Sequence, residues 1–337
     1  MTAVVLRGDA RALPLPDESV DLIVTSPPYW GLRDYRDGEA SLVGQIGHEP
    51  TPQAYIAALL ECTAEWARVL KPTGSLFVVL GDKYANRTRG AWRGSSDGYT
   101  WRADSPRYIR PQDLPEKSLI GLPWRYAIGC IDQLGLILRA EIVWSKPSPM
   151  PESVTDRARR SHEQVFHFTR QQRYYSSTDA IREPHRAPRR KAGATAFGAR
   201  DANLVRTGTG AYVGPNPLGV IPGSVWEIAP QPLRGPSHIA ADHDAAFPPA
   251  LVRRIVLGWS PVDGVVLDPF GGTGTTALVA SVLGRYGITV DRSADYCRIA
   301  QWRVADPRER ARALGVDPPP PTPAGQGSLF DDVEVSA

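Results

Sequence analysis

Cysteine is scarce in this chain of 337 residues, which contains only Cys62, Cys130 and Cys297. No two of them have the spacing of metal ligands, so we expect no structural zinc site and no bound metal. The lack of a paired cysteine framework is typical of the reducing cytosol, and the N-terminal residues lack the long apolar run of a signal peptide. We therefore expect a cytoplasmic protein.

Long apolar runs and a large excess of charge of one sign are also absent. No stretch approaches 18 uninterrupted apolar residues, so we expect no membrane span. The net charge of +3 is too small to indicate a partner by itself. Hydrophobic residues nevertheless make up 42% of the chain, which is enough for a sizeable core.

Short apolar runs alternate with segments of helical periodicity along most of the chain. Strands are predicted at 3–7, 20–25, 75–80, 138–144, 264–268 and 286–291, and helices at about 55–70, 122–134, 247–259, 276–283 and 294–305. This alternation indicates an α/β protein with a doubly wound, mostly parallel sheet. Two arginine-rich segments, at 84–117 and 182–206, interrupt the pattern. We expect irregular basic insertions there.

A glycine-rich loop, DPFGGTGTT at 268–276, lies between a predicted strand and a predicted helix. Such a loop lets a ligand approach the backbone, and the helix N-terminus offers free N–H groups to an anion. Because Thr275 stands where a Walker loop needs lysine, that interpretation is excluded. The G-x-G-x-x-A spacing with Asp291 19 residues after Gly272 fits a dinucleotide, and it equally fits S-adenosylmethionine. A purely structural turn is the third alternative, and the loop alone leaves all three open.

A second loop, TSPPYW at 25–30, follows the predicted strand at 20–25 and so lies at the edge of the sheet where ligands bind. Its prolines present rigid carbonyl acceptors, Ser26 adds a side-chain oxygen, and Tyr29 and Trp30 offer aromatic faces. Acceptors beside an aromatic face suit an exocyclic amine on a flat ring, whose lone pair becomes more nucleophilic when its hydrogens are held. A base would have to leave the duplex to reach this loop. A rigid structural turn is the alternative interpretation.

Together, the two loops resemble the motifs of the amino-group DNA methyltransferases, in particular the bacterial and phage class whose catalytic loop precedes the cofactor loop. Segments at 68–74, 141–146, 162–163 and 243–248 also resemble motifs of this family, so the likeness covers most of the chain. The resemblance implies a seven-stranded-type methyltransferase sheet that is circularly permuted. The chain would begin with the strand that leads to Asp9 and finish with the strands that end at Asp268 and Asp291.

The resemblance also assigns roles to individual residues. It implies that the catalytic residues are Ser26, Pro27, Pro28 and Tyr29, and that S-adenosylmethionine is bound by Asp9, Asp268, Phe270, Gly272, Gly274, Thr275 and Asp291. Ser26 and the Pro27 carbonyl would accept hydrogen bonds from the target amine, and Tyr29 would stack on the base. A serine at the first catalytic position favours cytosine N4, with adenine N6 as the alternative. A nicotinamide-dependent oxidoreductase and an inactive DNA-binding relative are the more distant alternatives.

The basic segment at 182–206 lies where relatives of this family place their target-recognition region. We predict DNA contacts from Arg182, Arg186, Arg189, Arg190, Lys191, Arg200 and Arg206, because such cations suit phosphates and guanine edges. A solvated basic surface is the alternative. The implied organisation is a catalytic half at 1–175 with its insertion at 84–117, a target-recognition region at 176–225, a cofactor-binding half at 226–312 and a flexible tail at 313–337.

The resemblance indicates double-stranded DNA as the partner of a nucleoid-associated bacterial or phage protein, and it also allows a homodimer and a cognate restriction enzyme. Residues 326–330, Gln326-Gly327-Ser328-Leu329-Phe330, resemble the short peptide with which bacterial proteins dock on the replicative sliding clamp. A tail without such a partner is the alternative for these five residues.

Overall fold

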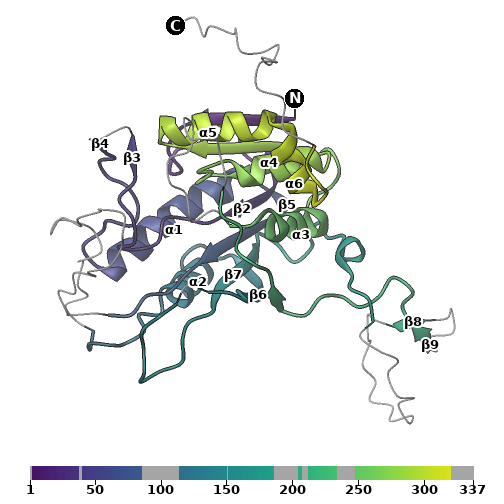
Figure 1. The fold of residues 1–337 in the computed structure, drawn as a ribbon, viewed down its shortest axis with the longest axis horizontal. Helices are drawn as coiled ribbons and strands as arrows, with labels where there is room; N and C mark the ends of the chain where they lie inside the picture. The colour runs from purple at the N-terminus through teal and green to yellow at the C-terminus, as the bar shows by residue number, and fades with distance from the viewer. Residues whose placement is uncertain are drawn as a thin grey trace, which may run out of the picture.

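The computed structural model describes residues 2–37, 40–85, 114–149, 151–185, 204–206, 212–233 and 247–319. Its centre is an eight-stranded sheet (Figure 1). In spatial order the strands are β1 (Ala3–Arg7), β12 (Tyr286–Asp291), β11 (Val265–Asp268), β2 (Val20–Thr25), β5 (Leu70–Leu80), β7 (His162–Thr169), β6 (Ile137–Ser145) and β10 (Val225–Glu227).

The strands are mostly parallel, as the alternation of elements predicts. Only β7 runs antiparallel to its neighbours, β5 and β6, among the described strands of this sheet. The strand β1 pairs in parallel with β12, so the beginning of the chain lies beside its last strand. This order confirms the permuted methyltransferase topology, with two strands, β7 and the three-residue β10, that the sequence pattern did not predict.

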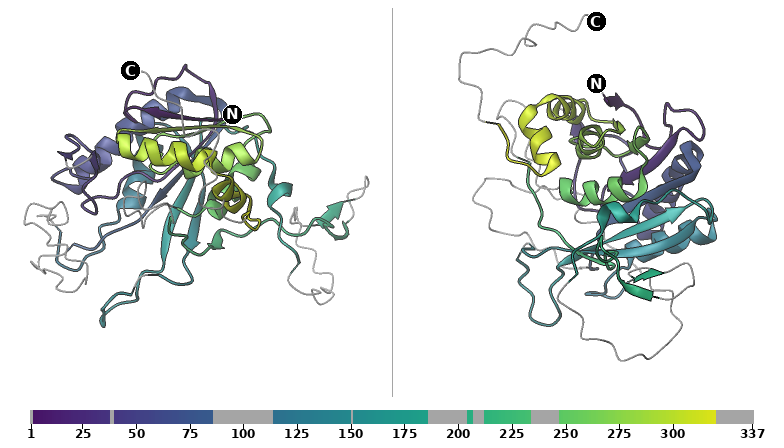
Figure 2. Two further views of the ribbon diagram at one scale, coloured as in Figure 1. Left: turned by 45° about the horizontal axis from the view of Figure 1, so that its top comes forward. Right: turned by 90° about the vertical axis from the view of Figure 1, so that its right-hand side faces the viewer.

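Helices cover both faces of the sheet (Figure 2). They are α1 (Pro52–Val69), α2 (Leu122–Asp132), α3 (Pro249–Trp259), α4 (Thr275–Val282), α5 (Ala294–Ala305) and α6 (Pro307–Leu314), with a 3-10 turn at Thr178–Ile181. Side chains of α1 and α2 pack in one core, and those of α3 and α4 pack in another.

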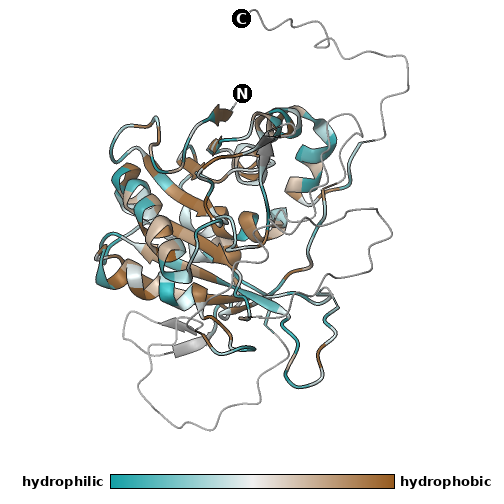
Figure 3. Cartoon of the chain, turned by 90° about the vertical axis from the view of Figure 1, so that its left-hand side faces the viewer, coloured by the Kyte–Doolittle hydropathy of each residue, from teal (hydrophilic) through white to brown (hydrophobic). Residues whose placement is uncertain are grey.

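The strand β2 shows how the two cores are separated. Ile23 enters the core under α1 and α2, whereas Leu22 and Val24 enter the core under α3 and α4. Successive residues of a strand point to opposite faces, so a strand buried on both sides is a continuous apolar run. The strands accordingly form the hydrophobic interior of the molecule (Figure 3).

Two smaller antiparallel pairs lie outside the main sheet. They are β3 (Arg36–Asp37) with β4 (Ala40–Ser41), and β8 (Leu204–Arg206) with β9 (Tyr212–Pro215). The strand β8 corrects the expectation that the whole of 182–206 is irregular. At the other end of the chain, α6 extends to Leu314 and buries Ala313, so ordered structure continues past the predicted start of the tail at 313.

Within the described ranges, no helix combines the length and the apolar character needed to cross a membrane. The central part of the 84–117 insertion and residues 326–330 lie outside the described residues. The expectations for those segments therefore stay predictions from the sequence.

Candidate active site

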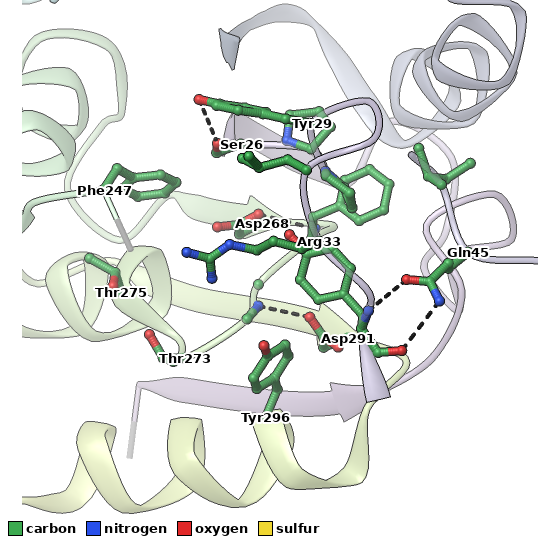
Figure 4. A pocket seen from close by; sticks show the side chains of 18 of the residues that line it. Ser26, Tyr29, Arg33, Gln45, Phe247, Asp268, Thr273, Thr275, Asp291 and Tyr296 are labelled. Atoms are coloured by element: carbon green, nitrogen blue, oxygen red, sulfur yellow. Dashed lines mark hydrogen bonds between the residues drawn. The ribbon is translucent and has the colours of Figure 1, made fainter. Parts of the chain in front are cut away.

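A cavity of about 500 Å³ opens where the carboxyl ends of β1, β2, β11 and β12 meet (Figure 4). This is the edge of an α/β sheet at which ligands bind, and the volume is within the range of small-molecule sites. Both predicted loops line the cavity: Ser26, Pro27, Pro28 and Tyr29 from one, and Asp268, Phe270, Gly272 and Thr275 from the other. Asp9 and Asp291 line it as well. The structure thus brings together two loops from opposite ends of the chain.

The catalytic loop is held by hydrogen bonds on two sides. The Tyr29 hydroxyl donates to Glu163 Oε2 at 2.8 Å, and the Ser26 hydroxyl lies 3.5 Å from the same phenol oxygen. The Lys146 ammonium pairs with the other oxygen of Glu163. Burial and the nearby Glu163 carboxylate raise the pKa of Tyr29 well above its ordinary value, so its hydroxyl remains a neutral donor.

The neighbours of this loop decide which acceptors are available. The Tyr55 hydroxyl donates to the Pro28 carbonyl at 2.9 Å, which occupies that oxygen. Ser26 and Pro27, the predicted sources of the amine acceptors, both line the cavity. The Tyr29 ring lies close against Gly81, where a methyl group would come within 2.7 Å of the ring carbon Cε2. This backbone contact supports one side of the ring.

Trp30 does not offer a second aromatic face to the cavity, which corrects the sequence interpretation. Its side chain is 1% exposed, and its indole N–H donates to the Glu49 carbonyl at 2.8 Å. Trp30 anchors the loop in the core, because its ring is buried there and its single donor has an acceptor.

The glycine loop is closed by two carboxylates. Asp268 accepts from the Phe270 amide at 3.1 Å and from the Thr276 hydroxyl at 2.8 Å. Asp291 accepts from the Gly272 amide and the Ser293 amide, each at 2.9 Å. Burial raises the pKa of both, that of Asp268 to about 7.

Two glycines of the loop have different tasks. Gly272 has φ of +48°, and a methyl group added to it would meet only open space beside the cavity. Its missing side chain leaves room for a ligand against the backbone, which fits the cofactor predicted there. Gly274 has φ of +77°, and its added methyl would lie 2.7 Å from Ala300 Cβ. Its role is therefore close packing of α4 against α5.

The other predicted cofactor residues also have partners within the protein. Both oxygens of Asp9 accept from the Arg11 guanidinium, at 3.0 and 2.8 Å, and this bonding holds the pKa of Asp9 below its ordinary value. Phe270 meets the edge of Trp66 at a ring distance of 5.8 Å. These contacts fix the cavity wall at Asp9 and Phe270.

A buried arginine under the glycine loop was missed by the sequence analysis. Arg303 of α5 donates to the carbonyl of Thr273 at 3.1 Å, to its hydroxyl at 2.8 Å and to the hydroxyl of Thr275 at 2.9 Å. It is paired with Glu309 of α6 at 3.0 Å, and both side chains are 5% exposed. Thr275 thus lines the cavity and, through its hydrogen bond from Arg303, ties the glycine loop to α5.

Further cavity residues come from outside the two loops. They include Arg11, Arg33, Tyr35, Gln45, Trp144, Lys146, Glu163, Phe247, Arg292 and Tyr296. Only Trp144, Lys146, Glu163 and Phe247 belong to segments that resemble family motifs. The position of Arg33 shortly after the catalytic loop was the one signal that could have indicated it.

Of the seven cations predicted to contact DNA, only Arg182 has a described side chain. It is 6% exposed, pairs with Asp179 and donates to the Gly219 carbonyl at 2.9 Å. These contacts show a structural role, so we do not retain Arg182 as a DNA contact. The side chains of the other six lie outside the described residues.

Comparisons with known proteins show the family of this chain. The DNA methylase family model matches residues 20–302. The Type II methyltransferase M.SmaI from Serratia marcescens is 37% identical over 302 residues, which span 89% of this chain and 90% of the relative. The Type II methyltransferase M.Cfr9I from Citrobacter freundii is 35% identical over 304 residues, which span 90% of this chain and 87% of the relative.

Solved structures show the same fold. The PvuII DNA methyltransferase, described as cytosine-N4-specific, matches with a TM-score of 0.60 and 20% identity over 93% of this chain and 94% of its own. A putative DNA modification methylase from Thermus thermophilus, solved in complex with S-adenosyl-L-methionine, matches with a TM-score of 0.53 and 24% identity over 92% and 95%. The chain therefore belongs to the N6/N4 DNA methylase family, and it is an enzyme that transfers a methyl group from S-adenosylmethionine to an exocyclic amine of a DNA base.

Proposed function

We propose that this enzyme methylates the N4 amine of cytosine in double-stranded DNA. The observation that carries the proposal is Ser26, a neutral hydroxyl at the first position of the catalytic loop, where the resemblance associates an acidic residue with adenine. The carboxylate that contacts this loop, Glu163, is occupied by Tyr29 and Lys146. Among the described residues of this loop, the target amine therefore meets neutral oxygen acceptors.

The residues of the loop act by position and polarity. S-adenosylmethionine supplies an activated methyl group on a sulfonium. Ser26 and the Pro27 carbonyl accept the two hydrogens of the amine, which localises the nitrogen lone pair toward the methyl group. The Tyr29 ring, supported on one side by Gly81, stacks on the flipped cytosine. In the transfer, a new C–N bond to the methyl group would replace the C–S bond of the sulfonium, and the amine proton would then leave to solvent.

Chemical analysis of DNA tests the base. DNA from a host that lacks its own DNA methyltransferases, expressing the folded protein, is digested to nucleosides and examined by mass spectrometry. We expect N4-methylcytosine above the level of an empty-vector control. N6-methyladenine in its place would refute the choice of base and leave the family assignment intact. If neither methylated nucleoside appears although soluble protein is present, the proposed activity is contradicted.

We also propose that the region at 176–225 recognises the target sequence, chiefly through the segment between Glu183 and Val220. Glu183 and Val220 exchange two backbone hydrogen bonds of 2.9 Å, and Arg182 donates to the Gly219 carbonyl beside them. The chain thus leaves the core and returns to it at one point. This geometry supports a deletion that spares the core.

Replacing residues 187–215 with a short Gly-Ser linker tests that region. We expect S-adenosylmethionine binding in calorimetry to remain within about threefold of wild type, because the cavity residues lie outside the deletion. DNA methylation should fall to the background level. Retained site-specific methylation would refute the assignment of this region. The homodimer, the restriction enzyme and the clamp contact stay predictions from the sequence.

A further inference from the structure

Among the described residues, three of the four cations that line the cavity have a partner within the protein. Arg11 pairs with Asp9, Lys146 pairs with Glu163, and Arg292 donates to the backbone carbonyls of Val43 and Gly44. Within the described part of the chain, the guanidinium of the fourth cation, Arg33, has no hydrogen bond or ion pair with another residue. A guanidinium inside a cavity is costly unless an anion or several acceptors meet it.

The acidic residues of the cavity do not supply that anion. The two oxygens of Asp291 accept from backbone amides, and those of Asp268 accept from an amide and a hydroxyl. The carboxylate of Glu163 is occupied by Lys146 and Tyr29. Among the described residues of the cavity, no acidic side chain is left to pair with Arg33, so a bound ligand can supply the anion.

The backbone that carries Arg33 is fixed. The side chain of the buried Gln45 accepts from the Tyr35 amide at 2.7 Å and donates to the Tyr35 carbonyl at 3.3 Å. The His48 ring nitrogen meets the Arg33 carbonyl at 3.0 Å. Because the backbone is held at Arg33 itself and two residues later, the side chain starts from a defined point on the cavity wall.

The side chain of Arg33 points into the cavity, toward the side on which Thr273 and Thr275 lie (Figure 4). The helix α4 begins there, at Thr275. Burial raises the pKa of Tyr35 to about 12, and the positive charge of Arg33 opposes this effect on both Tyr35 and Tyr296. The charge of Arg33 therefore lies near enough to Tyr35 and Tyr296 to act on both hydroxyls.

We propose that Arg33 binds the α-carboxylate of S-adenosylmethionine and is a cofactor-binding residue of this enzyme. The inference requires that the enzyme uses S-adenosylmethionine, and it does not depend on which base is methylated. Asp291 would hold the ribose of the cofactor and Gly272 would leave room for its methionine part. The Arg33 guanidinium, which points toward the side of Thr273 and Thr275, would hold the carboxylate. A planar guanidinium can meet both carboxylate oxygens.

Calorimetry with two ligands tests the pair. For Arg33→Met, we expect the Kd of S-adenosylmethionine to rise about 10- to 100-fold, because a charge-assisted hydrogen bond is lost. The Kd of decarboxylated S-adenosylmethionine should change less than about threefold, because this ligand lacks the partner of Arg33. Arg33→Lys should lie between wild type and Arg33→Met. The matched control is Arg298→Met, an exposed arginine outside the cavity, which should leave both affinities unchanged.

The comparison of two ligands on one preparation separates binding from folding. A variant that is partly unfolded would weaken both ligands equally, which would contradict the proposal. A fluorescence anisotropy titration with a random-sequence DNA duplex, without cofactor, provides the other arm. Unchanged S-adenosylmethionine binding with weakened DNA binding would overturn the proposal and assign Arg33 to a DNA phosphate. If the wild type methylated adenine, the expected effects of Arg33→Met on the Kd values of the two ligands would be unchanged.

Discussion

The buried pair of Arg303 and Glu309 offers the sharpest test of how the cofactor loop is held. Glu309→Leu would leave the Arg303 guanidinium, 5% exposed, without its carboxylate. Removing one partner of a buried pair costs about 3–5 kcal/mol. At about 2.1 cal/mol/K of unfolding entropy per residue, 1 kcal/mol shifts the midpoint of thermal unfolding of 337 residues by about 1.4 °C, so the midpoint should fall by about 4–7 °C.

The double variant Arg303→Met/Glu309→Leu should behave differently. It buries no charge, so the large penalty disappears, but the Thr273 carbonyl loses a donor at 3.1 Å. An unsatisfied buried carbonyl costs about 1–3 kcal/mol, and we expect the double variant to be destabilised by that amount. The double variant should bind S-adenosylmethionine more weakly than the wild type does, because Thr273 and Thr275 have lost the hydrogen bonds from Arg303.

Urea titration of the wild type, both single variants and the double variant measures these free energies of unfolding. Arg298→Met is the control, because its exposed pair with Asp295 should contribute under about 1 kcal/mol. If Glu309→Leu cost no more than the control, or if the double variant were less stable than Glu309→Leu, the reasoning would be refuted. Wild-type affinity in the double variant would show that Arg303 does not position the loop.

Three further predictions concern the cavity. Tyr29→Phe removes the hydroxyl bound to Glu163, and single-turnover methyl transfer should slow about 10-fold or more, since one charge-assisted bond is lost; an unchanged rate would contradict this. Gly272→Ala places a residue with a side chain at a left-handed φ, which costs about 1–2 kcal/mol, and the added methyl group occupies cavity space. Calorimetry should therefore show weaker cofactor binding, and an affinity equal to that of the wild type would refute this prediction. The pKa of Asp268 is raised to about 7, so its folded form binds a proton that its unfolded form releases near pH 4. The contribution of Asp268 to the free energy of unfolding therefore falls as pH rises between about 4 and 7. In urea titrations, the stability of Asp268→Asn relative to wild type should increase over that window and then level off, and a difference that does not depend on pH would contradict the raised pKa.

The elements that could be predicted from sequence are those with a strong local pattern. The apolar runs at 3–7, 20–25 and 286–291 coincide with β1, β2 and β12. The strand β7, HEQVFHFT, was missed because its antiparallel pairing with β5 and β6 is set by residues far away in the chain. The helix α6 was missed because it is highly charged, and the burial of Glu309 depends on Arg303.

The candidate site shows the same division. Both loops could be recognised because glycines and prolines impose local geometry that a motif preserves. Arg303 could not, because it is a single arginine whose role depends on partners from other elements, and the only signal for Arg33 was its position shortly after the first loop. An arginine on a surface helix and one under a cofactor loop look alike in sequence. The hydrogen bonds to Thr273 and Thr275 distinguish them.

The pairing of β1 with β12 has a consequence for synthesis of the protein. Ala3 pairs with Gly287, and Asp291 pairs with Arg7, so the first strand waits for about 280 further residues before its neighbour exists. At about 5–20 residues per second, translation of that length takes about 14–56 s. During this interval β1 and one edge of β2 have no partner strand, because β11 is also made late. A nascent chain of this enzyme therefore exposes apolar strand edges during this interval, and it can assemble its methyl-transfer site only after β11 and β12 have been made.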